Sequence, residues 1–190
     1  MPLHIFEPRY KALISDALAS DKLLGVVQLR PGWHDDYFGA PPVYRMMGVG
    51  KIIEAERFDD GRYDIILSGL YRTQIRQEIP GNQYRRAEVE VVEDLVVPGR
   101  ETEVKDVHSI LLKIFDKLAA ALPDGYSILP GVDIDALEPG MLVDVMASLL
   151  VDDAYERQSL LGEPDVSRRQ QLLRVQIRNM FNPLPAEEDS

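Results

Sequence analysis

The stretch that decides the fold is Met46–Ser68, MMGVGKIIEAERFDDGRYDIILS. Runs rich in apolar and β-branched residues lie on both sides of Asp59-Asp60-Gly61. A glycine at the end of such a turn accepts the positive φ that a tight hairpin requires. The pattern therefore predicts a β-hairpin whose strands are Met46–Phe58 and Tyr63–Ser68.

Further strand-like runs lie outside this hairpin, at Leu3–Phe6, Leu23–Leu29, Tyr71–Ile79 and Tyr84–Val92. Gly69, between two runs, marks a sharp turn or a bulge. One short amphipathic helix begins at Pro8, because apolar residues recur at helical spacing up to Leu18. Several short strands with hairpin connections and a single helix predict a small, partly closed antiparallel barrel.

Past Val97-Pro98-Gly99 the apolar pattern becomes helical. A stripe from Val104 to Leu122 predicts a long helix. After a loop at residues 124–137, three more helices are predicted, at Met141–Val151, Asp153–Leu161 and Asp165–Phe181, with Asp165 as the N-cap of the last. We expect an α+β protein with a β domain at residues 1–98, a helical bundle at 99–190 and a frayed acidic tail from about residue 183.

Composition excludes several classes of function. The 190 residues carry a net charge of -11 and no cysteine. Disulfides, thiolate metal sites and cysteine nucleophiles are therefore excluded. Broad electrostatic binding to nucleic acid is disfavoured, because the acidic surface repels phosphates. No apolar run approaches the roughly 18–20 residues of a membrane helix, and no leader is recognisable, so we expect a cytoplasmic protein without membrane contact.

The sequence nominates no catalytic residue, no cofactor site and no metal site. Gly48-Val49-Gly50-Lys51-Ile52 lacks both the upstream glycine and the hydroxyl residue of a phosphate-binding loop. The three histidines, His4, His34 and His108, lie far apart and outside any ligand pair. We therefore expect a protein that is not an enzyme.

The segment Arg30–Arg45, RPGWHDDYFGAPPVYR, concentrates aromatic residues among prolines and glycines. In one interpretation, which we favour, its aromatic side chains cover the open end of the barrel and are buried there. In the other, they present a preorganised apolar surface to a partner. The candidate partner-binding residues are Trp33, Tyr37, Phe38 and Tyr44.

Basic side chains on the predicted strands also have two interpretations. An RNA-binding patch is one of them. Acidic residues alternate with the arginines, however, so cross-strand ion pairs on a solvated face are the stronger interpretation. The residues are Lys51, Arg57, Arg72, Arg76, Arg85 and Arg86, with Glu54, Glu56, Glu78, Glu88 and Glu90.

A family resemblance adds to this interpretation. The segments that carry it are PLHIFEPRY, LLGVVQL, PPVYRMMGVGKIIEAERFDDGRYDIILSGLYRTQI, YRRAEVEVVED, LVDVMASLL and ERQSLLGEPDVSRRQQLL. In order and spacing they resemble the N-terminal substrate-binding domain of Lon ATP-dependent proteases over most of residues 2–175. The resemblance implies a PUA-like pseudo-barrel followed by a helical bundle.

The resemblance also implies a function. Full Lon proteases add an AAA+ ATPase module and a Ser-Lys peptidase domain, and this chain ends before either. The resemblance therefore implies a non-catalytic module that binds unfolded or tagged polypeptides. Such a module would act as an adaptor in protein quality control, together with a separate ATPase or protease. The alternative is a PUA-like protein that binds RNA or a small ligand. Inheritance of function from a fold is analogy.

Family-signature residues are expected to be structural, with Glu7 as a partner of Arg72. Relatives generally have one more strand before this motif. We expect either that Met1 is internal to a longer reading frame, which we favour, or that the missing strand leaves a sheet edge open, to which an extended peptide could pair. The signature residues are Glu7, Arg9, Tyr10, Gly48, Gly61, Arg62, Gly69 and Arg72.

Overall fold

The computed structural model describes residues 1–37, 39–81, 83–123, 127–129 and 131–181. The chain forms two compact units, a β unit from Met1 to Glu93 and a helical unit from Asp94 onward. The β unit ends shortly before the Val97-Pro98-Gly99 stretch from which the sequence predicts the boundary. Each unit has an apolar core of its own. The predicted α+β class, an antiparallel sheet followed by helices, is confirmed.

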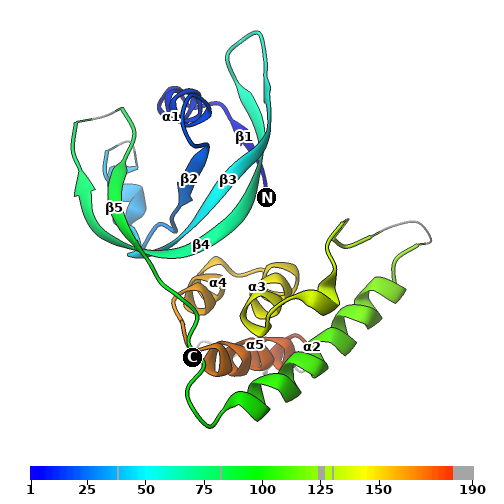
Figure 1. Ribbon diagram of the computed structural model, residues 1–190. Coiled ribbons are helices and arrows are strands. Elements are labelled where there is room, and N and C mark those ends of the chain that lie inside the picture. Colours follow the sequence, from blue (N-terminus) through cyan, green and yellow to red (C-terminus); the bar gives the residue numbers. More distant parts are fainter. Residues whose placement is uncertain (38, 82, 124–126, 130, 182–190) are drawn as a thin grey trace, which may run out of the picture. The chain divides into compact units, whose positions relative to one another are not determined.

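The sheet of the β unit is organised around one long strand, β4 (Tyr63–Ile79). Figure 1 shows how strongly this strand curves. One edge of β4 pairs first with β1 (Pro2–Ile5) and later with β5 (Arg86–Val91), while its other edge pairs with β3 (Met46–Arg57). The strand β2 (Leu23–Val26) pairs with β3. These strand pairings are antiparallel, and residues 3–5 of the predicted run Leu3–Phe6 pair with β4, while Phe6 lies beyond the end of β1.

The predicted hairpin between β3 and β4 is confirmed. The backbone N–H of Phe58 donates to the carbonyl of Arg62 at 2.9 Å. Gly61 has a φ of 80°, which a residue with a side chain rarely adopts. The side chain of Asp60 accepts a hydrogen bond from the backbone N–H of Arg62 and holds the turn from the other side.

One strand prediction is wrong in its boundaries. Tyr63–Ser68 and Tyr71–Ile79 were expected as separate strands, but they form the single strand β4. The irregularity at Gly69 is a bulge rather than a turn, because Gly69 pairs with Gly50 and Tyr71 with Val49, so Leu70 is the extra residue. A bulge bends a strand without ending its ladder.

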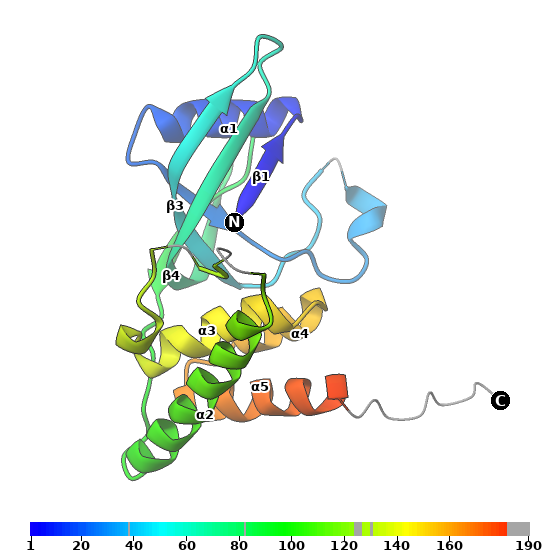
Figure 2. The ribbon, with the colours of Figure 1, turned by 90° about the vertical axis from the view of Figure 1, so that its right-hand side faces the viewer.

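Helix α1 (Pro8–Leu18) packs its apolar side on the sheet, and Figure 2 shows it lying across β3 and β4. Ile14 is fully buried and Ala17 is nearly so. The strand β2 is shorter than the predicted Leu23–Leu29. After Val26 the chain leaves the sheet, and Leu29 forms an isolated bridge to Val43. The buried residues of this core are Ile14, Ala17, Leu24, Ile52, Tyr63, Ile65 and Leu67.

The helical unit contains α2 (Glu101–Ala120), α3 (Pro139–Leu150), α4 (Ala154–Leu161) and α5 (Val166–Phe181). Helix α3 begins two residues earlier than predicted, because a proline suits the first turn. The side chain of Asp165 accepts a hydrogen bond from the backbone N–H of Ser167, so its predicted role as an N-cap is confirmed. The core lies between α2, α3 and α5, where Leu111, Leu142 and Leu173 are fully buried.

Arg169 of α5 is fully buried in the helical unit. Its Nη1 donates to the carbonyl of Glu163 at 2.8 Å, and its Nη2 donates to Asp94 Oδ2 at 2.7 Å and to the carbonyl of Gly140 at 3.3 Å. Its Nε lies 3.0 Å from Asp144 Oδ1. A side chain at Gly140 would collide with Asp94 and crowd Arg169. The Arg169 guanidinium therefore links α5 to α3 and to Asp94, the first residue of the helical unit.

Candidate functional site

The segment Arg30–Arg45, here called the aromatic loop, leaves the sheet after β2 and returns at β3. Figure 2 shows it standing out from the sheet. Its base is closed by backbone hydrogen bonds from Arg30 N–H to the carbonyl of Pro42, at 2.8 Å, and from Tyr44 N–H to that of Gln28, at 3.0 Å. The two ends of the aromatic loop therefore lie close together, as in a compact surface loop.

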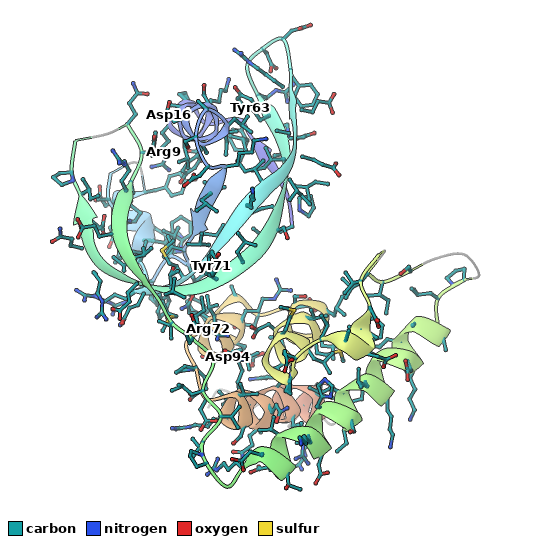
Figure 3. All side chains as sticks on the ribbon, viewed as in Figure 1. Arg9, Asp16, Tyr63, Tyr71, Arg72 and Asp94 are labelled. Atoms are coloured by element: carbon teal, nitrogen blue, oxygen red, sulfur yellow. The ribbon has the colours of Figure 1, made fainter. Side chains whose placement is uncertain are left out.

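Tyr37 anchors the aromatic loop to the start of α1. Its hydroxyl donates to Glu7 Oε1 at 3.0 Å, while Arg9 Nε donates to Glu7 Oε2 at 2.9 Å. Arg9 Nη1 also donates to the carbonyl of Tyr37 at 3.5 Å. Figure 3 labels Arg9, which lies in the first turn of α1. Both carboxylate oxygens of Glu7 are therefore engaged by residues other than the Arg72 expected from the sequence, and that pairing is wrong.

The anchor also explains the electrostatics of Tyr37. Its hydrogen bond to the Glu7 carboxylate, together with the negative charge of that group, raises the pKa of the Tyr37 hydroxyl. The neutral phenol is therefore the form that the Glu7 anchor favours.

Aromatic rings stack on this anchor and form what is here called the aromatic cluster: Tyr10, Trp33, His34 and Tyr37, with Arg9. The ring of Trp33 stacks on His34, with centroids 3.6 Å apart, and lies 5.6 Å from the ring of Tyr37. The Arg9 guanidinium lies over the rings of Tyr10 and Tyr37, at 4.7 and 5.4 Å. Such cation–π contacts fix the rings without removing them from solvent.

The aromatic cluster lies outside the apolar core of the β unit. Trp33 and Tyr37 are half-buried, and Tyr10 keeps 38% of its surface exposed. Of the other candidates, Tyr44 is half-buried at the base of the loop, with Arg30 over its ring, and Phe38 lies outside the described residues. The structure thus brings Trp33 and Tyr37 together and adds Arg9, Tyr10 and His34, which sequence reasoning had not assigned to a binding surface.

The remaining signature residues lie in the sheet. Gly61 forms the hairpin turn, Gly69 adjoins the bulge, and Arg62 pairs with Asp60 next to the same turn. Gly48 pairs with Arg72 across β3 and β4, and the carbonyl of the buried Arg72 accepts a hydrogen bond from the N–H of Val92.

A second feature of the aromatic loop is an open groove of about 440 Å³, here called the proline groove. Residues 40–43 and Arg45 line one wall, and residues 75–78 of β4 with Arg85 line the other. The lining therefore combines apolar side chains, including Pro41, Pro42 and Ile75, with arginines.

Arg85 links the two walls of the proline groove. Its Nη1 donates to the carbonyl of Pro41 at 2.6 Å, and its Nε donates to Glu78 Oε2 at 2.9 Å. A second ion pair joins Arg76 to Glu90 across β4 and β5. For Arg76 and Arg85, the prediction of ion pairs on the strands is thus confirmed.

The Glu78–Arg85 pair is expected to weaken at acid pH. Its hydrogen bonds and the positive charge of Arg85 lower the pKa of the Glu78 carboxyl. Because this pKa is lowered on folding, the contribution of the pair is fully present above the ordinary glutamate pKa, about 4.3, and is lost as the pH falls through the lowered value. The measurement is hydrogen exchange at the loop amides of Ala40, Val43, Tyr44 and Arg45. Exchange at these amides should quicken on acidification beyond the intrinsic trend in the native protein and not in Glu78→Gln. Equal acid responses in the two proteins would contradict this assignment.

The described ranges contain no cluster of metal ligands and no helix suited to a membrane. No three carboxylate or histidine side chains there come together as ligands of a metal ion. Among the helices of those ranges, none has the length and apolar character needed to cross a membrane.

Comparison with known proteins places this architecture in a family. Residues 1–178 match the family described as the ATP-dependent protease La (LON) substrate-binding domain. The chain belongs to this family, and it is a substrate-binding module by that description.

Relatives match over nearly the whole chain. It is 29% identical over 171 residues to the Lon protease of Dictyoglomus thermophilum, a match that covers 90% of this chain and 21% of the relative. It is 27% identical over 177 residues to Lon protease 2 of Myxococcus xanthus, with 91% and 21% covered. The chain thus spans about a fifth of the length of these relatives.

Two solved structures have the same fold. The N-terminal domain of Mycobacterium avium complex Lon protease aligns with a TM-score of 0.63 at 20% identity, over 97% of this chain and 91% of that one. The Lon N-terminal domain protein from Xanthomonas campestris aligns with a TM-score of 0.58 at 19% identity, over 97% and 89%.

Proposed function

We propose that this protein binds unfolded or tagged polypeptide segments, without transforming them, and that the aromatic cluster is the contact surface. The observation that carries the proposal is the Trp33–Tyr37 pair, which is held by Glu7 and Arg9 outside the apolar core. Rigid, partly exposed aromatic rings lose little conformational entropy when they bind an apolar side chain. The family description as a substrate-binding domain supports the same function.

An adaptor role extends this proposal: the chain would hold a polypeptide for a separate ATPase or protease. Binding of RNA is disfavoured by the net charge of -11 and by the pairing of Arg76 and Arg85 with glutamates. Structured RNA serves as the competing probe, because binding through phosphates falls steeply with salt whereas binding through apolar side chains does not. RNA that binds tightly with such a salt dependence would overturn the polypeptide proposal.

Replacing Trp33 by alanine is expected to weaken polypeptide binding about tenfold, the effect of losing one aromatic anchor of about 1.4 kcal/mol. The probe is a fluorescein-labelled synthetic peptide of 16 residues and zero net charge that carries leucine and phenylalanine, and the readout is fluorescence anisotropy. In a second peptide serine replaces the apolar residues, and we expect little binding of it.

The matched control for Trp33→Ala is Tyr155→Ala, which removes a 42% exposed aromatic ring from the helical unit. It should bind the first peptide as the native protein does. Thermal melts followed by circular dichroism verify that both variants fold. Unchanged affinity in Trp33→Ala, or equal binding of the two peptides by the native protein, would remove the aromatic cluster from this role.

A further inference from the structure

The proline groove opens where two neighbouring chain segments separate. Arg45, just before β3, still accepts a hydrogen bond from the N–H of Ile75 at 2.8 Å. The last pair of the β3–β4 ladder is Met46 with Gln74. Beyond this point, β4 continues to Ile79 with β5 on one edge, and in the described part of the chain no strand pairs with its other edge. The groove therefore follows a free strand edge.

The walls of the groove are held in place before any ligand arrives. Arg85 bonds Glu78 on the strand side and the Pro41 carbonyl on the loop side. Pro41 and Pro42 add rigidity, because the ring of proline fixes φ. A preorganised groove loses little entropy when a chain enters it.

The charges of the groove are not balanced. Three arginines and one glutamate line it, and Glu78 is committed to Arg85 while Arg76 pairs with Glu90. The exposed guanidinium of Arg45 has no anionic partner among the described residues. In a chain with 32 acidic and 21 basic side chains, an arginine that remains unneutralised beside an apolar groove marks a place for an external anion.

We propose that the proline groove binds an extended polypeptide segment that carries a carboxylate, with Arg45 as the partner of that carboxylate and the free edge of β4 as the partner of the peptide backbone. This inference rests on the proposed function and names the class of segment that it selects. Strand addition supplies the affinity through backbone hydrogen bonds, and side-chain contacts supply the selectivity. The guanidinium suits a carboxylate because its planar donors match the two oxygens.

The test uses three labelled peptides derived from the neutral 16-residue probe. In the acidic peptide two glutamates replace two glutamines, and in the third peptide the central amides of the acidic one are N-methylated. We expect the acidic peptide to bind about fivefold more tightly than the neutral one at low salt, the effect of one charge-assisted hydrogen bond at a partly exposed site. N-methylation should remove that gain and part of the common affinity, because it removes backbone donors.

Arg45→Gln should abolish the fivefold preference for the acidic peptide over the neutral one. Arg86→Gln is the matched control, because it removes the same charge from β5, outside the groove lining, and it should keep the preference. Those backbone amides of residues 77–79 that point away from β5 should gain protection from hydrogen exchange when the acidic peptide is present.

The outcomes separate this inference from the proposed function. If both peptides bind equally and Arg45→Gln changes neither affinity, the groove assignment is overturned while polypeptide binding stands. If neither peptide binds, the proposed function fails and the inference fails with it. In a competition experiment, the unlabelled acidic peptide, inorganic phosphate and RNA of equal charge are each added as competitors of the labelled acidic peptide. If phosphate or RNA displaces it at a lower concentration than the unlabelled peptide does, Arg45 binds a phosphate ligand and the proposal is overturned.

Discussion

Replacing Arg169 by methionine is expected to lower the free energy of unfolding of the helical unit by roughly 2–4 kcal/mol. Methionine fills much of the same apolar volume, but it donates no hydrogen bond. The carbonyls of Glu163 and Gly140 and the carboxylate of Asp94 would then lose a donor that reaches them in a fully buried position. The loss falls short of that for a fully buried ion pair, because the Asp94 side chain is 37% exposed and water can compensate part of it.

The measurement is urea unfolding followed by circular dichroism at 222 nm, where the helices α2–α5 dominate the signal. Arg168→Met is the matched control, since it removes the neighbouring arginine of the same helix, whose side chain is 70% exposed and lies 3.4 Å from Glu163. An exposed pair of this kind contributes about 0–1 kcal/mol. If the midpoint of Arg169→Met shifts no further than that of Arg168→Met, the buried arginine does not stabilise the unit.

The local features of this fold are written in short stretches of the sequence. The turn Asp59-Asp60-Gly61 predicts the β3–β4 hairpin because only neighbouring residues decide its geometry. The helices follow from apolar spacing in the same way. Gly69 shows the limit of local reasoning, because a glycine signals a turn and a bulge alike, and only the pairing with β3 distinguishes them.

The site depended on contacts that no local pattern encodes. Tyr37 reaches Glu7 across 30 positions, and Arg85 reaches Pro41 across 44. A carboxylate accepts equally from an arginine or a phenol, so the sequence alone could not choose Tyr37 over Arg72 as the partner of Glu7.

For Arg169, unlike Tyr37 and Arg85, the sequence does contain a signal of its buried position. Arg169 lies three residues after Val166 and four before Leu173, on the buried stripe of α5, and a charged residue at such a position indicates a buried, paired side chain.

Replacing Ile14 by alanine is expected to lower the free energy of unfolding of the β unit by about 2–5 kcal/mol, the range for truncating a buried isoleucine. Ile14 is fully buried in the core cluster between α1 and the sheet. The change also affects the aromatic cluster, because α1 begins next to Glu7 and carries Arg9. Tyr37 and Arg9 both donate hydrogen bonds to the Glu7 carboxylate.

Trp33, the single tryptophan of the chain, reports this coupling directly. When α1 leaves the sheet, the aromatic loop loses its anchor, so urea unfolding followed by Trp33 fluorescence should move to lower urea in Ile14→Ala. Ile53→Ala is the matched control, since it truncates the same residue type in the same unit at a bulge where 59% of the side chain is exposed, and surface changes of this kind cost less than about 0.5 kcal/mol. Coincident Trp33 transitions in the two variants would mean that the aromatic cluster is not held by the core beneath α1, and the mechanism proposed for its preorganisation would then be wrong.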